Sequence, residues 1–90
     1  MEQKEVRVFI VPRTAEDASG EVKTALRLAM DSAGLSLRAL EARSGVSRPT
    51  IGNLANGKGG VDKKKAVAIS EALGLKVWNL FEHGDSAEVA

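Results

Sequence analysis

The sequence has no cysteine, no tyrosine and only three aromatic residues in a chain of 90. Without cysteine, the chain cannot form a disulfide scaffold, Cys-ligated zinc, an iron–sulfur cluster or a thiol nucleophile. Three rings are too few for the stacking platforms that bind single-stranded nucleic acid. No apolar run approaches the ~18 residues of a membrane span, and the N-terminus has no signal-peptide pattern. These absences predict one small cytoplasmic domain that does not enter a membrane.

Charge is nearly balanced overall, with 13 Lys and Arg against 12 Asp and Glu, but it is unevenly distributed. Residues 21–83 contain ten basic and six acidic residues, whereas both ends of the chain are acidic. Most of the basic excess lies in residues 36–65. A basic middle between acidic ends favours a polyanionic partner. An ordinary solvated surface is the alternative, because many domains carry such an excess.

An alternating apolar pattern near the N-terminus, ended by Pro12, predicts a β-strand over residues 6–11. The polar, small residues 14–20 are typical of a linker. A lone strand leaves backbone N–H and C=O groups unpaired, and no other segment is a convincing partner for it. Pairing with a second copy around a two-fold axis is therefore the simplest solution. The expected dimer interface is Val6, Arg7, Val8, Phe9, Ile10 and Val11.

The alternatives for this strand are an unpaired arm and a strand that packs on the chain's own helices. A third possibility is the edge of another protein's sheet, as in an antitoxin that binds its toxin by strand addition.

Helical spacing of apolar residues predicts five further elements. They are residues 20–33, residues 37–44, a helix between Ser47 and Asn56, a helix between Asp62 and Gly74, and residues 77–81. Ser19, Ser36, Ser47 and Asp62 are expected to cap helix starts, and Leu37 and Leu40 to face inward. The expected fold is mostly α, a five-helix domain over 20–83 that follows an arm and linker over 1–19. A flexible tail covers 84–90.

The second and third helices, with a glycine turn between them, form a helix-turn-helix pattern. Its residues are Gly45-Val46-Ser47 at the turn, Ile51 and Leu54 on the inner face, and Asn56-Gly57-Lys58 at the end. These motifs occur in the order found in the Cro/CI-type (lambda-repressor-like, XRE) helix-turn-helix family, and the sequence of residues 22–82 resembles that family. The resemblance implies a short phage Cro-type repressor in a bacterial cytoplasm. Such a homodimer would bind an inverted-repeat operator in double-stranded DNA through the major groove.

The third helix is implied to be the recognition helix, with base-reading residues Arg48, Pro49, Thr50, Gly52 and Asn53. Arg48 suits a bidentate contact to guanine and Asn53 one to adenine. Gly52 either allows close approach to the groove or is simply tolerated. The implied phosphate contacts are Ser36, Arg38, Arg43, Ser47, Asn56 and Lys58.

One residue departs from the family pattern, since Glu41 stands where a small residue usually lets the two helices approach. Glu41 is expected to turn outward or to pair with a nearby arginine. Catalysis is not expected, because the single histidine, His83, has no catalytic partners nearby in sequence. No residues have metal-ligand spacing, and neither a cofactor nor a small-molecule ligand is expected.

Overall fold

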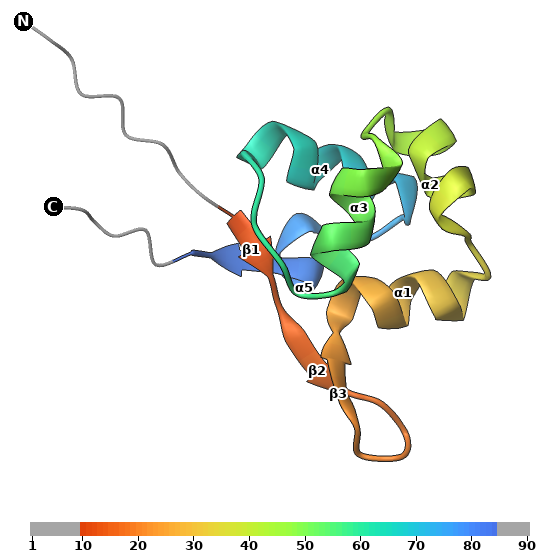
Figure 1. Cartoon of the computed structure of the whole chain (residues 1–90), viewed down its shortest axis with the longest axis vertical. Helices are drawn as coiled ribbons and strands as arrows, with labels where there is room; N and C mark the ends of the chain where they lie inside the picture. Colours follow the sequence, from red (N-terminus) through yellow and green to blue (C-terminus); the bar gives the residue numbers. More distant parts are fainter. Residues whose placement is uncertain (1–9, 85–90) are drawn as a thin grey trace, which may run out of the picture.

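The computed structural model describes residues 10–84. Five helices cluster together, and two small sheets lie beside them (Figure 1). The helices are α1 (Ala25–Ala33), α2 (Leu37–Ser44), α3 (Arg48–Ala55), α4 (Lys63–Ala72) and α5 (Val77–Leu80). The strands are β1 (Ile10–Pro12), β2 (Thr14–Glu16), β3 (Val22–Thr24) and β4 (Phe81–His83). The mostly α, five-helix fold expected from the sequence is confirmed.

Helix α2 spans the residues expected, because both of its ends carry strong local signals. The Ala39 N–H donates to the Ser36 Oγ at 3.1 Å, which caps the start of the helix. At the other end Gly45 adopts a φ of 79°, a left-handed conformation that glycine tolerates best, and its N–H donates to Glu41 O. Asp62 caps α4 in the expected way by accepting from the Lys65 N–H at 2.9 Å.

The hydrophobic core lies where the helices meet. Leu40 of α2, Ile51 and Leu54 of α3 and Ile69 of α4 are all buried. Val46, in the turn before α3, is also buried. Leu37 is different: it is 37% exposed, so the prediction that it faces inward is wrong. It is the first residue of α2 and lines the shallow depression beside Gly52 of α3.

The N-terminal strand is paired inside the chain. β1 runs antiparallel to β4, with Ile10 opposite His83 and Pro12 opposite Phe81. On the other side of β1, Ile10 and Val61 exchange two backbone hydrogen bonds of 2.9 Å. The prediction that no segment of the chain could pair with this strand is therefore wrong. The prediction failed because Phe81 continues the apolar pattern of α5 in the sequence and was assigned to that helix. In the structure its backbone dihedrals are extended.

Ile10 is wholly buried against the other core residues, so it has no surface to offer a second copy. Its assignment to the dimer interface is corrected accordingly. Val11 is half-buried and lies within β1. The remaining four interface residues, Val6, Arg7, Val8 and Phe9, lie outside the described residues.

Residues 14–24, expected to hold a linker and the start of the first helix, form an antiparallel hairpin of β2 and β3. The Asp17 side chain closes its turn by accepting from the Ser19 N–H, the Ser19 hydroxyl and the Glu21 N–H. These bonds, led by that of the Ser19 hydroxyl, lower the pKa of Asp17 to about 2. Helix α1 consequently begins at Ala25 and not near Gly20, and Thr24 caps it in place of Ser19.

Candidate nucleic-acid interface

Helix α3 presents one face to the core and the opposite face to solvent. Its inner residues, Ile51, Leu54 and Ala55, are at most 6% exposed. The predicted base-reading residues divide into exposed Arg48, Pro49 and Asn53 and half-buried Thr50 and Gly52. This division follows from a helical period of 3.6 residues, which sends positions opposite the core outward. All five predicted base-reading residues therefore retain some access to solvent along one helix.

The outward face of α3 is shallowly hollowed. A depression of about 480 Å³ is lined by Leu37, Arg48, Pro49, Gly52, Asn53 and Asn56. Gly52 leaves part of this depression open, because it has no side chain. A Cβ at this position would meet only the Leu37 Cδ1, at an ordinary contact distance of 3.7 Å. Packing within the chain therefore does not require glycine at position 52.

Glu41 pairs with Arg48, which is one of the two outcomes expected for it. Its Oε1 lies 3.0 Å from the Arg48 Nε, and its Oε2 accepts from the Arg48 N–H at 3.2 Å. One carboxylate thus holds both the side chain and the backbone of the first residue of α3. The pairing explains how a glutamate fits where a small residue was expected, since its charge lies at the surface between α2 and α3.

Ser47 occupies the N-cap position of α3, but its side chain makes no capping hydrogen bond. Its hydroxyl instead donates to the Thr50 Oγ1 at 3.0 Å. The first N–H groups of α3 would otherwise lack acceptors within the helix. Glu41 supplies one of the missing acceptors, so the helix start depends on α2 for part of its capping.

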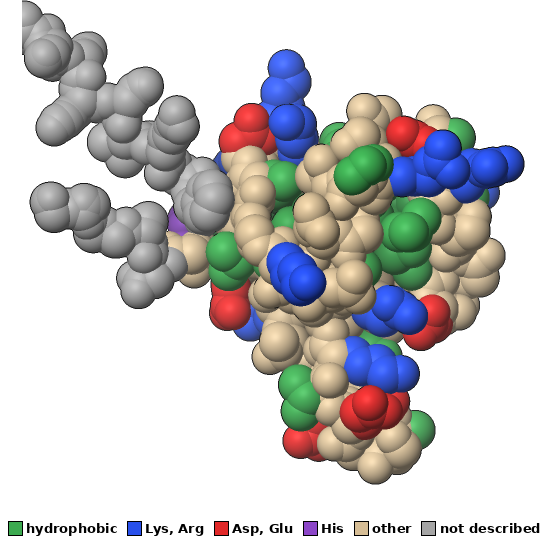
Figure 2. Space-filling model, in the orientation of Figure 1, with side chains coloured by type: hydrophobic (Ala, Val, Ile, Leu, Met, Phe, Trp, Pro, Cys, Tyr) green, Lys and Arg blue, Asp and Glu red, His purple; other side chains and the backbone are tan. Residues whose placement is uncertain are grey.

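The predicted phosphate-contacting residues are all exposed. Ser36, Arg38, Arg43, Ser47, Asn56 and Lys58 belong to this set. Within residues 10–84, no ion pair involves Arg38, Arg43 or Lys58, so their charges are open to a polyanion. Figure 2 shows Lys and Arg side chains spread over the face that carries α3, with acidic side chains among them and on the hairpin.

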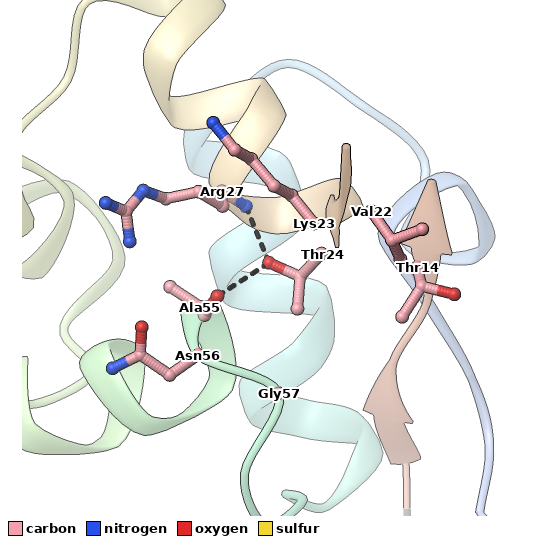
Figure 3. Close-up of a pocket in the computed structure, with 8 residues that line it drawn as sticks. All are labelled: Thr14, Val22, Lys23, Thr24, Arg27, Ala55, Asn56 and Gly57. Atoms are coloured by element: carbon pink, nitrogen blue, oxygen red, sulfur yellow. Dashed lines mark hydrogen bonds between the residues drawn. The ribbon is translucent and has the colours of Figure 1, made fainter. Parts of the chain in front are cut away.

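A second depression, of about 340 Å³, separates the hairpin from the end of α3 (Figure 3). At its base the Thr24 hydroxyl donates to Ala55 O at 2.8 Å and accepts from the Arg27 N–H at 3.0 Å. This pair of bonds ties the start of α1 to the end of α3. Arg27 also lines a third hollow, with Leu37, Gly52 and Asn56.

Sequence reasoning missed Arg27 and Leu37 as residues of this surface. The signal for Arg27 was its position on α1 next to Leu26, since an amphipathic helix exposes the residue beside its buried stripe. Leu37 had no comparable signal, because leucine at the first position of a helix is equally compatible with core and surface.

None of the helices in residues 10–84 is long and apolar enough to cross a bilayer. In the same part of the chain, His, Asp and Glu side chains form no cluster of three or more that could hold a metal ion.

A protein-family model described as helix-turn-helix matches residues 26–77, which is more than half of the chain. The match begins in α1 and ends at the first residue of α5, so it contains α2 and α3 and leaves out both sheets. Searches of curated proteins and of solved structures returned no match. The exposed α3, braced by α2 behind a glycine turn, agrees with the family match. The chain belongs to the Cro/CI-type helix-turn-helix family and carries a DNA-binding domain of the kind found in regulators.

Proposed function

We propose that this protein is a transcriptional repressor that reads double-stranded DNA by placing α3 in the major groove. One observation carries the proposal: α3 exposes Arg48 and Asn53, which line one shallow depression, and further exposed cations lie on α2 and in the loop after α3. An α-helix fits the major groove, where each base pair shows a distinct pattern of donors and acceptors. The proposed activity is binding, and no residue is assigned a catalytic step.

The proposed contacts separate into two kinds, as in other protein–DNA interfaces. Arg48 reads guanine through its terminal amino groups, and Asn53 reads adenine through its amide. Thr50 and Pro49 offer a methyl group and a ring for apolar contact with thymine. Arg38, Arg43 and Lys58 neutralise phosphates and fix the register without reading sequence. Ser36 adds the exposed start of α2, where N–H groups and the helix dipole favour an anion.

The proposal includes a two-fold homodimer on an inverted repeat. A single eight-residue helix reaches few base pairs, whereas two copies about 34 Å apart would read successive major grooves on one DNA face. The proposed interface is narrower than the sequence suggests. It comprises residues 6–9 and the neighbouring Val11. Ile10 is left out because it is buried in the core. Toxin binding by the same strand is not proposed, because no contact among residues 10–84 favours it.

Selection of sites from a randomised duplex pool at near-physiological salt tests the proposal. We expect an enriched inverted repeat with half-sites about one helical turn apart. A single unrepeated site would retain sequence reading and exclude the two-fold dimer. Absence of any enriched sequence would contradict the proposed function. Sedimentation of the purified protein with and without the selected site measures the dimer independently, and a promoter–reporter fusion carrying the site distinguishes repression from activation.

A further inference from the structure

We propose that Glu41 is a positioning residue for base recognition: it holds the Arg48 side chain in the orientation that reads guanine. The inference rests on the proposed function, in which Arg48 contacts a base. It adds a specificity determinant that itself lies on α2 and touches no base. It also gives a role to the one residue of the motif that departs from the family pattern.

The geometry of the pair leaves the reading end of the arginine available. A guanidinium has five N–H donors, one on Nε and two on each terminal nitrogen. The Glu41 Oε1 lies 3.0 Å from Nε, so the salt bridge engages the inner side of the fork. The terminal nitrogens keep their donors, and two of these in parallel match the O6 and N7 acceptors of guanine. Glu41 therefore fixes the side chain without using the groups that the base requires.

The same carboxylate also fixes the backbone from which this side chain projects. Its Oε2 accepts from the Arg48 N–H at 3.2 Å, while the Ser47 hydroxyl is directed to Thr50 and caps nothing. A carboxylate at a helix N-terminus is further favoured by the helix dipole. Because both carboxylate oxygens of Glu41 bind Arg48, they restrict the backbone and the side chain of this arginine. An arginine held in advance loses less conformational entropy when it binds a base.

Glu41 is also expected to weaken binding to DNA of any sequence, in contrast to its favourable effect on guanine recognition. Its charge is half-exposed, with 36% of the side chain accessible, and lies beside Arg48, the first residue of the proposed recognition helix. A carboxylate there repels every duplex, whatever the sequence. Removal of Glu41 should therefore lower the preference for guanine and raise the affinity for unrelated DNA. A residue that served the fold alone would lower both quantities together when removed.

The test compares the wild type with Glu41→Ala, Glu41→Gln and Arg48→Ala on three duplexes. These are the selected site, the same site with its Arg48-dependent G·C pair changed to A·T, and an unrelated sequence. The base pair read by Arg48 is identified as the position of the site at which Arg48→Ala no longer prefers G·C. The matched control is Glu82→Ala, which removes the carboxylate that faces Arg13 at 3.9 Å on β4, outside α2 and α3. Thermal unfolding shows which variants are folded at the assay temperature.

We expect Glu41→Ala to reduce the guanine-over-adenine preference about fivefold, a part of what a full bidentate contact provides. Affinity for the unrelated duplex should rise about twofold, as expected when one repulsive charge is removed. Glu41→Gln keeps an acceptor without the charge and should fall between Glu41→Ala and the wild type. In the Glu41→Ala, Arg48→Ala double variant, no preference beyond that of Arg48→Ala should be lost. Glu82→Ala should leave both quantities unchanged.

Full guanine preference in Glu41→Ala would overturn the inference and leave the proposed function standing. An equal loss at every base pair, with weaker binding to unrelated DNA, would also overturn it by showing a structural role. If Glu41→Ala does not fold, Glu41→Gln decides between these outcomes. Failure of the wild type to select any sequence would defeat the proposed function itself, and that result is visible before any variant is made.

Discussion

The outer face of α3 and the small sheet of β1 and β4 use their residues in opposite ways. On α3, Arg48 leaves 48% of its side chain exposed and is held by one surface carboxylate. In the sheet, Ile10 and Phe81 are fully buried, and backbone hydrogen bonds link β1 to β4 and to Val61. The α3 face offers groups for a partner, whereas the sheet uses its groups to join the two ends of the described chain.

We infer from this difference that separate residues provide DNA binding and stability in this small domain. Burial of an apolar side chain contributes to folding in proportion to the area removed from water, and exposed residues contribute little. Substitutions in the sheet should therefore unfold the protein without altering its base preference. Substitutions on the outer face of α3 should alter DNA binding and leave the fold intact.

The largest expected effect is that of Phe81→Ala in the sheet. Loss of a fully buried phenylalanine should reduce the free energy of unfolding by about 3–5 kcal/mol, because the core keeps a cavity in place of the ring. Urea denaturation measures the change. At protein concentrations and temperatures where the variant is still folded, its order of preference among duplexes should match the wild type. A loss below about 1 kcal/mol would show that the sheet is not part of the core.

Arg48→Ala tests the other side of the comparison. We expect it to relax base preference at one position in each half-site by about 1–3 kcal/mol, the value of a good bidentate contact. Its stability should change little, because the pair that it loses is half-exposed to solvent. Binding measured on all four base pairs at each position checks the expectation. Uniform weakening across positions would move Arg48 from the base-reading group to the phosphate group.

Lys58→Ala should weaken binding about equally on all duplexes and reduce the slope of log affinity against log salt by about 1. The loop should keep its shape in this variant, since its backbone is held by the Lys58 N–H, which donates to Asn53 O at 2.7 Å. A salt titration on specific and unrelated DNA measures both effects. A changed base preference would show that Lys58 reads sequence.

In Gly52→Ala, a single added methyl group should change stability and DNA affinity in opposite directions. Alanine should stabilise α3 by about 0.5–1 kcal/mol, because glycine is the poorer helix former and the new Cβ meets only Leu37. DNA affinity should fall at the same time, as the methyl group stands between the helix and the groove. Chemical denaturation and duplex titration of the one variant give both values. Unchanged affinity would mean that glycine is simply tolerated here.

The smallest effect is expected in the hairpin, away from the outer face of α3. With a pKa of about 2 in the folded protein against an ordinary 3.8, Asp17 stabilises the fold at pH values above 3.8. This contribution should disappear as the pH falls from about 4 towards 2. Carboxyl NMR titration measures the pKa directly, and Asp17→Ala should abolish this part of the acid response. An ordinary pKa would show that the turn is open in solution.

Sequence patterns predicted the helices well where the signals are local. Ser36 and Gly45 mark the ends of α2 because capping and a left-handed glycine involve residues a few positions apart. The exposed face of α3 was likewise predictable, since helical period alone places Arg48 and Asn53 opposite Ile51.

The remaining features depend on residues far apart in the chain or on competing local patterns. Pairing of β1 with β4 joins residues at opposite ends of the described chain, and no short-range pattern shows such a contact. The hairpin did leave a local signal, because Asp17 and Gly20 are turn residues and Val22 and Thr24 are β-branched. Apolar spacing from Val22 onward favoured a helix instead. For the site, sequence suggested that Glu41 could pair with an arginine, but only the structure identifies Arg48 and the two atoms that it holds.

A titration of the ¹⁵N-labelled protein with its selected duplex, followed through backbone amide chemical shifts, shows which elements of the protein meet the DNA. We expect the largest changes in α3, at the start of α2 and in the loop after α3, with Arg48, Asn53 and Lys58 among them. Small changes are expected in β1 and β4, whose backbone bonds stay within the chain. Changes concentrated in the sheet or the hairpin, with α3 unaffected, would contradict the claim that α3 meets the DNA.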